Sequence, residues 1–152
     1  MTKILFVCHG NICRSPMAEY VMKDLVRQLG REDEFVIASA ATSREELGNP
    51  VYPPVRRKLA EHGIRCDGHV ARQMTRKDYE EFGYLIGMDR MNLSNMARIC
   101  GGDPEGKCSL LLAHAGQSGD VADPWYTGDF EATWQDVNIG CRALLKELTE
   151  KK

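Results

Sequence analysis

A cysteine and an arginine lie close together near the N-terminus of this 152-residue chain, with a glycine and an asparagine between them. Cys8 and Arg14 are separated by five residues, which include Gly10 and Asn11. Glycine and asparagine tolerate the left-handed backbone conformation, which can fold a loop so that several N–H groups point at one anion. The planar guanidinium of Arg14 matches two oxygens of a phosphate. These residues predict a loop that binds an oxyanion next to a thiol.

Cys8 is well placed to act as a nucleophile in such a loop. Inward-facing amides, a helix N-terminus and the charge of Arg14 all favour the thiolate, which is the reactive form of cysteine. Ser15 could donate a hydrogen bond to this thiolate or assist its departure as a leaving group. We therefore expect Cys8 to attack a group that the loop binds.

Other uses of the two cysteines in this loop must be weighed. Cys8 and Cys13 lack the two-residue spacing of a zinc site, and no second Cys/His pair is well placed, so no metal is expected. Two buried structural cysteines would not account for Arg14 and the Gly-Asn pair in the same turn. A redox role stays open, because Cys13 could resolve an oxidised Cys8 in a regulatory disulfide.

The segments around the loop have the patterns of a strand, a helix and a second strand. Residues 3–8 are a short apolar run, residues 16–29 carry apolar residues at helical spacing, and residues 34–42 are strand-like. Ser15 is expected as the helix N-cap and Pro16 as the first helical residue. This order predicts a parallel pair of strands, with the loop at the carboxyl end of the first strand, where ligands bind in such folds.

The rest of the chain continues the same alternation. The patterns predict helices over 55–63, 75–82, 90–100 and 130–149, and strands over 84–88 and 109–115. The chain therefore predicts an α/β fold in which helices cover both faces of a small parallel sheet. We expect a single domain over residues 1–152.

Composition limits the possible partners and the compartment. The net charge is −2 and the pI is about 6.1, which argues against a nucleic-acid-binding protein. The sequence contains no run of about 18 apolar residues, so no membrane span is predicted. Six cysteines without a secretory signal favour reduced thiols in the cytoplasm. We expect a cytoplasmic monomer.

The segment VCHGNICRSPMAE, at residues 7–19, resembles the phosphate-binding loop of the low-molecular-weight protein tyrosine phosphatases. Further motifs follow in the order of that family: SAATS (39–43), GNPVYPP (48–54), HGI (62–64), HVARQ (69–73), MDRMNL (88–93) and DPW (123–125). The resemblance implies a three-layer sandwich with a four-stranded parallel sheet. It also implies hydrolysis of phosphotyrosine monoesters through a cysteinyl-phosphate intermediate, without a metal or other cofactor. The expected partners are phosphotyrosine proteins or aryl phosphates.

The resemblance also assigns roles outside the loop. Asp123 is expected as the general acid, since expelling a phenolate near neutral pH requires a proton on the leaving oxygen. The same carboxyl group could then act as the base toward water. Trp125 and Tyr126 offer aromatic walls for a phenyl ring. The loop residues expected to bind the substrate are His9, Gly10, Asn11, Ile12, Cys13 and Ser15.

In this family a hydrogen-bond network supports the loop. The matching residues here are Asn11, Ser15, Ser39 and His69. Asp89 also matches a family aspartate, for which we expect a structural role.

The chain departs from the family at two places. Arg44–Leu47, which includes Glu45, replaces a stretch that often carries an aromatic residue in the family, so we expect a more open and more polar pocket wall. Residues 51–54 replace a common family element, with no consequence that the sequence reveals.

Three other functions fit parts of this pattern. An arsenate reductase on the same scaffold would use two further cysteines to relay a disulfide, and Cys100 and Cys108 are candidates. A protein-arginine phosphatase would carry a threonine in place of Ile12, which favours a phenyl ring instead. A phosphoprotein-binding module would not need both Cys8 and Asp123.

Overall fold

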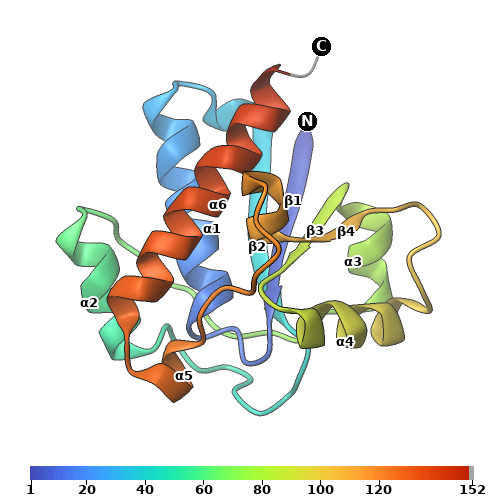
Figure 1. The fold of residues 1–152 in the computed structure, drawn as a ribbon, viewed down its shortest axis with the longest axis horizontal. Helices are drawn as coiled ribbons and strands as arrows, with labels where there is room; N and C mark the ends of the chain where they lie inside the picture. The colour runs from blue at the N-terminus through green and yellow to red at the C-terminus, as the bar shows by residue number, and fades with distance from the viewer. Residues whose placement is uncertain (151–152) are drawn as a thin grey trace.

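The computed structural model describes residues 1–150, in which four parallel strands form one sheet (Figure 1). The strands are β1 (Thr2–Cys8), β2 (Phe35–Ala41), β3 (Tyr84–Gly87) and β4 (Cys108–Leu110), in the order β2-β1-β3-β4. Every neighbouring pair is parallel. β1 therefore lies inside the sheet, and this position explains its continuous apolar sequence.

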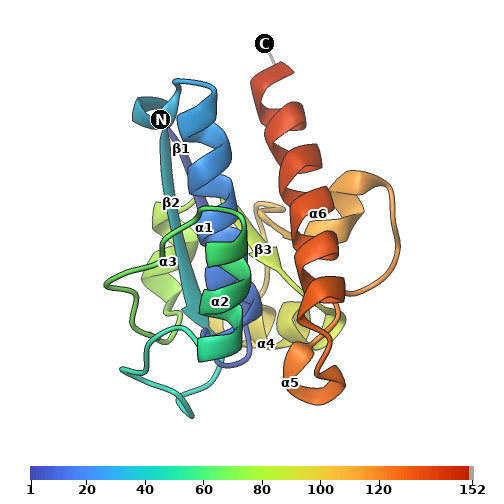
Figure 2. The same ribbon diagram turned by 90° about the vertical axis from the view of Figure 1, so that its left-hand side faces the viewer.

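Helices cover both faces of the sheet, as the two views show (Figures 1 and 2). The helices α1 (Arg14–Gln28), α2 (Pro53–Glu61) and α6 (Phe130–Glu150) lie on one face, and α3 (Arg76–Glu81) and α4 (Arg90–Cys100) on the other. Alternate residues of β1 enter different cores: Ile4 and Phe6 pack with the first group, and Leu5 and Val7 with the second. The expected three-layer sandwich is confirmed.

The predicted strand over 109–115 is wrong beyond Leu110. β4 ends there, and Leu111–Ala115 form a 3-10 helix, η2. β4 pairs with β3, whose last residue, Gly87, lies opposite Leu110. The chain beyond Leu110 therefore has no ladder to extend, and Leu111 is buried in the same core as α6.

Hydrogen bonds fasten this edge of the sheet to the C-terminal helix. Ser109 Oγ lies 2.8 Å from His114 Nε2, and His114 Nδ1 lies 2.9 Å from Glu147 Oε1 on α6. The edge strand β4 is short, but its continuation is anchored to a long helix.

The predicted N-cap of the first helix is also wrong. α1 begins at Arg14, and the preceding Cys13 makes no side-chain capping bond. Ser15 lies inside the first turn, and its hydroxyl faces Cys8 instead. Pro16 is tolerated in this first turn, where a backbone N–H has no helical partner. Two short helices were not predicted: η1 (Glu32–Glu34) and α5 (Pro124–Thr127).

Candidate active site

The loop between β1 and α1 wraps its backbone around the Cys8 sulfur. The N–H groups of Asn11 and Ser15 donate to Cys8 Sγ, with N–S distances of 3.3 and 3.4 Å. Asn11 has a φ of +61°, in the left-handed region that non-glycine residues rarely adopt. This turn is what brings the two amides onto one atom, at the carboxyl end of a central strand.

Arg14 begins α1 and reaches across the pocket although only 3% of it is exposed. Its Nη1 donates to Asp89 Oδ2 at 2.8 Å and to the Val121 carbonyl at 3.2 Å. Its Nη2 donates to Asp123 Oδ2 at 3.3 Å. Burial alone disfavours the charged guanidinium, but Cys8 and the two carboxylates outweigh it and raise the pKa of Arg14. Arg14 is thus a fixed positive charge beside the sulfur.

Asp123 occupies the N-cap position of the short helix α5. Its Oδ1 accepts the N–H of Trp125 at 3.0 Å, while Oδ2 accepts from Arg14. Asp89 has the same position on α4, where its side chain accepts the N–H of Asn92 at 2.7 Å. Both carboxylates that meet Arg14 are therefore oriented by the start of a helix.

These residues line one pocket of about 380 Å³. The predicted site residues that line it are Cys8, His9, Gly10, Ile12, Cys13, Arg14, Asp123, Trp125 and Tyr126. The lining residues that were not predicted to bind substrate are Glu45, Glu46, Asp89, Met91 and Asn92. Within residues 1–150, no three His, Cys, Asp or Glu side chains are grouped so that they could hold a metal ion.

The pocket wall is polar, as expected from the departure at Arg44–Leu47. His9 Nε2 lies 2.7 Å from Glu45 Oε2 at the mouth of the pocket. The Glu46 side chain covers Gly10 so closely that a Cβ there would lie 3.3 Å from Glu46 Cγ. Trp125 packs against Tyr52, with ring centroids 5.2 Å apart.

Asn11 and Ser15 lie behind the pocket, in a network of buried polar groups. Ser15 Oγ lies 3.1 Å from Cys8 Sγ and accepts from Asn11 Nδ2 at 2.8 Å. Asn11 Nδ2 also donates to Ser39 Oγ at 2.9 Å. The Asn11 carbonyl oxygen lies 2.9 Å from His69 Nε2. All four residues expected in the network are therefore brought together.

Sequence reasoning missed Glu19, which joins this network. Only 6% of Glu19 is exposed, and its Oε1 accepts from Ser39 Oγ at 2.5 Å. A single glutamate in an amphipathic helix gives no local sign that it points inward. Glu19 is the last residue of the segment that resembles the family's loop, and its apolar neighbours Ala18 and Met22, both buried, were a further hint.

The other cysteines are separate from the pocket. Cys100 ends α4 and Cys108 begins β4, so both lie toward the amino ends of the strands, while Cys8 ends β1. They pack in the second core and do not line the pocket. This placement gives no support to a disulfide relay. Cys13 does line the pocket, and burial, followed by the proximity of Cys8, raises the pKa of its thiol to about 12.

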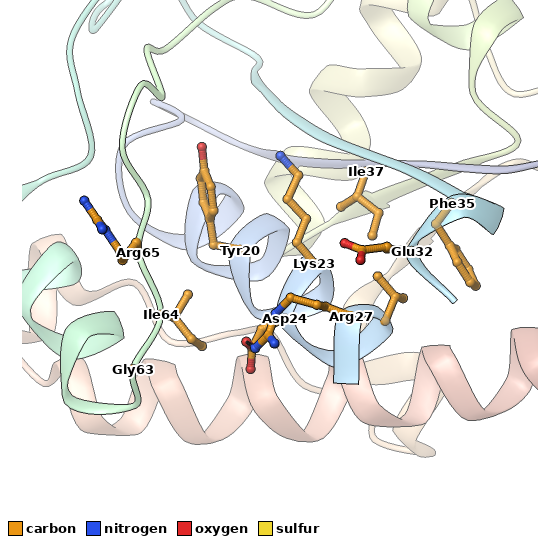
Figure 3. A pocket seen from close by; sticks show the side chains of 11 residues that line it. Tyr20, Lys23, Asp24, Arg27, Glu32, Phe35, Ile37, Gly63, Ile64 and Arg65 are labelled. Atoms are coloured by element: carbon orange, nitrogen blue, oxygen red, sulfur yellow. Dashed lines mark hydrogen bonds and ion pairs between the residues drawn. The ribbon is translucent and has the colours of Figure 1, made fainter. Parts of the chain in front are cut away.

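A second hollow, of about 570 Å³, lies between α1, the start of β2 and the segment after α2 (Figure 3). It contains none of the predicted site residues. Lys23 and Arg27 line it, and each pairs with an acidic residue of the same helix: Lys23 with Glu19 at 2.6 Å, and Arg27 with Asp24 at 2.5 Å.

Comparisons with known proteins agree on one family. Residues 3–152 match the family model described as low molecular weight phosphotyrosine protein phosphatase. The low molecular weight protein-tyrosine-phosphatase YfkJ of Bacillus subtilis is 38% identical, over 100% of this chain and 99% of that protein. A rat low molecular weight phosphotyrosine protein phosphatase is 39% identical, over 95% of this chain and 94% of its own.

Solved structures give the same result. The crystal structure of YfkJ superimposes with a TM-score of 0.95 at 38% identity and covers 100% of this chain and 97% of its own. That of SP-PTP, from Streptococcus pyogenes, has a TM-score of 0.89 at 41% identity and covers 99% and 95%.

Proposed function

This chain belongs to the low molecular weight phosphotyrosine protein phosphatase family, and from that premise we propose which of its residues carry out the reaction. The enzyme is a protein tyrosine phosphatase, a phosphoric monoester hydrolase. We assign Cys8 as the nucleophile, Arg14 as the phosphate clamp and Asp123 as the general acid and base. Residues 1–152 act as one phosphatase domain on phosphotyrosine proteins or aryl phosphates.

One observation carries the assignment: Asp123, which follows Arg14 by 109 residues, lines the same pocket as Cys8 and Arg14 of the loop. The Cys8 thiolate attacks phosphorus in line with the leaving oxygen, so that an S–P bond forms as the P–O bond breaks. The electron pair of that bond goes to the phenol oxygen, which takes a proton from Asp123. Arg14 and the loop amides hold the other phosphate oxygens.

The second step returns the enzyme to its starting state. Asp123, now a carboxylate, takes a proton from water as the water oxygen attacks phosphorus. The P–S bond breaks and its electron pair returns to Cys8, with the Ser15 hydroxyl 3.1 Å away as a donor to the departing thiolate. When a bound phosphate accepts the hydrogen bond from Arg14 Nη2, Asp123 Oδ2 loses this partner and is free to face the leaving oxygen.

The pocket walls support a flat aryl substrate. Ile12 offers an apolar contact, and Trp125 and Tyr126 are exposed aromatic side chains at the rim. An apolar wall favours a phenyl ring over a guanidinium, which must keep its hydrogen bonds. The remaining assignments are a cytoplasmic location, which six unpaired cysteines support, and a monomer.

Aryl phosphates whose phenols differ in acidity test the assignment. We expect Cys8→Ser to abolish turnover of every substrate, because the hydroxyl stays protonated. Asp123→Asn should lower kcat/KM, which reports the step that breaks the P–O bond, by about 10²- to 10⁴-fold for poor leaving groups and far less for p-nitrophenyl phosphate, whose phenolate departs without a proton. The wild-type enzyme should keep its activity in excess chelator. Full activity of Cys8→Ser would overturn the mechanism.

A further inference from the structure

Glu19 is a buried carboxylate that the proposed reaction does not use. Its two oxygens have different partners: Oε1 accepts from Ser39 Oγ at 2.5 Å, and Oε2 accepts from Lys23 Nζ at 2.6 Å. His69 Nδ1 lies 3.9 Å from Oε1. A buried charge is costly unless it is paired and hydrogen-bonded, and Glu19 meets both conditions.

The charge of Glu19 fixes the direction of the hydrogen bond from Ser39. An ionised carboxylate has only acceptors, so the hydroxyl hydrogen of Ser39 must point at Glu19. Ser39 Oγ then offers only lone pairs to Asn11. The side-chain amide of Asn11 must turn its Nδ2 group, and not its oxygen, toward Ser39.

The orientation of the Asn11 amide fixes the next hydrogen bond in turn. Asn11 Oδ1 accepts the N–H of Arg72 at 3.2 Å, and the second Nδ2 hydrogen is donated to Ser15 Oγ. Because Ser15 Oγ accepts from Asn11, its own hydrogen is available to Cys8 Sγ, 3.1 Å away. The donors and acceptors are thus ordered from Glu19 to the sulfur.

We propose that Glu19 is a positioning residue for Cys8, which acts through Ser39, Asn11 and Ser15 to keep the Ser15 hydroxyl hydrogen directed at the sulfur. Lys23 belongs to the same network, because its ammonium compensates the charge of the buried Glu19. This inference rests on the proposed role of Cys8 as the nucleophile.

The far end of this chain of bonds is accessible although Cys8 is buried. The Lys23 side chain is 43% exposed, lines the second hollow and lies with its Nζ 4.8 Å from the centre of the Tyr20 ring (Figure 3). Arg27 lines the same hollow but pairs with Asp24, which lies outside the chain of bonds. The helix therefore supplies a matched pair of cations, one connected to Cys8 and one not.

Glu19→Gln separates positioning from simple electrostatics, since the two predict opposite signs. Removing a negative charge would by itself favour the thiolate and lower the pH midpoint of Cys8 alkylation. A glutamine can also donate to Ser39, so only the N–H of Arg72 still orients the Asn11 amide, and the Ser15 hydroxyl faces the sulfur less often. Positioning therefore predicts that the midpoint rises.

The experiment measures the rate at which neutral iodoacetamide alkylates Cys8, as a function of pH, by mass spectrometry of the Cys8 peptide. We expect Glu19→Gln to raise the midpoint by about one pH unit and to lower kcat for p-nitrophenyl phosphate about tenfold, with little change in KM. Lys23→Met should shift the midpoint and kcat in the same directions by smaller amounts. Arg27→Met should shift neither.

A double variant tests whether the two residues act along one route. Glu19→Gln with Lys23→Met should match Glu19→Gln alone, because residues in one network are not additive. Ser39→Ala should also raise the pH midpoint of Cys8 alkylation, and adding Lys23→Met to it should cause no further change. This variant keeps the test decisive if Glu19→Gln does not fold. A midpoint that falls or stays constant in folded Glu19→Gln or Ser39→Ala overturns the inference. Activity that survives Cys8→Ser would instead overturn the proposed function.

Discussion

Asn11 meets two requirements that usually select different residues. Its φ of +61° favours glycine, while its hydrogen bonds to Ser15 and Ser39 require a side-chain amide. Asparagine is one of the few residue types that tolerates the left-handed region, and it supplies that amide as well. Its backbone carbonyl is also bonded to His69. A single residue therefore sets both the shape of the loop and the polarity of the network behind it.

Replacing Asn11 with glycine or alanine separates these two requirements. Both variants lose the amide, so we expect kcat to fall by about 10- to 100-fold in each, since the Ser15 hydroxyl loses its donor. Alanine in addition pays for the left-handed backbone, so its free energy of unfolding in urea should be about 1 kcal/mol lower than that of the glycine variant. Equal stability of the two variants, or full activity of Asn11→Gly, would contradict this account.

The residues proposed to carry out the reaction were largely predictable, and those that support them were less so. Cys8 and Arg14 were found from their types and local context, and Asp123 from the resemblance to the family; the three do line one pocket. Ser15 was predicted both to cap the helix and to donate to the Cys8 thiolate. It makes no cap, but its hydroxyl does lie 3.1 Å from the sulfur. Glu19 was missed, since which helical face is buried depends on tertiary packing.

At the scale of elements, α6 closes one face of the molecule by packing against η2 and α1 (Figure 2). Gly140, on α6, is buried where the Leu111 side chain of η2 comes close. A methyl group at Gly140 would overlap Leu111. The absence of a side chain at this one position lets the helix lie directly on η2.

Gly140→Ala should therefore destabilise the protein although alanine is the better helix former. We expect a loss of about 1 to 3 kcal/mol in the free energy of unfolding, as for other overpacked cores. Gly119→Ala, in the loop after η2, is the control for a glycine-to-alanine change without a clash, because a Cβ there would meet nothing within 4 Å. Urea denaturation of both variants measures the difference. An unchanged or higher stability of Gly140→Ala would show that η2 can move away freely.

The error at η2 shows where element prediction reaches its limit. The segment SLLLAHA is apolar enough for a buried strand and equally for a buried helical turn, and periodicity cannot separate these over so few residues. What decides is the length of β3, which ends opposite Leu110. This pairing is part of the tertiary structure and cannot be read from the local sequence. The longer helices over 90–100 and 130–149 were predicted well, because their patterns extend over several turns.

At the scale of the whole molecule, the cysteines are unpaired and mostly buried. Burial is the main cause that raises the pKa of five of them: Cys13, Cys66, Cys100, Cys108 and Cys141. Above the ordinary thiol value of 9.0 the unfolded chain loses these protons while the folded protein keeps them. The folded state then binds more protons, so its stability must fall as the pH rises.

The free energy of unfolding in urea should accordingly decrease between about pH 9 and the raised pKa values, which reach about 12 for Cys13 and Cys108. Cys141→Ala removes one fully buried thiol, and the slope of stability against pH should become shallower by about 1.4 kcal/mol per pH unit. The slope is the readout, since the variant also loses packing. A slope equal to that of the wild type would contradict the assignment.

The contacts of Arg14 have a consequence for the order in which the site forms during synthesis. Its guanidinium meets Asp89 and Asp123, which follow it by 75 and 109 residues. During synthesis Cys8 and Arg14 leave the ribosome before Asp89 and Asp123. Arg14 therefore stays without its two carboxylate partners until both have emerged. The proposed active site is complete only after Asp123 has been made.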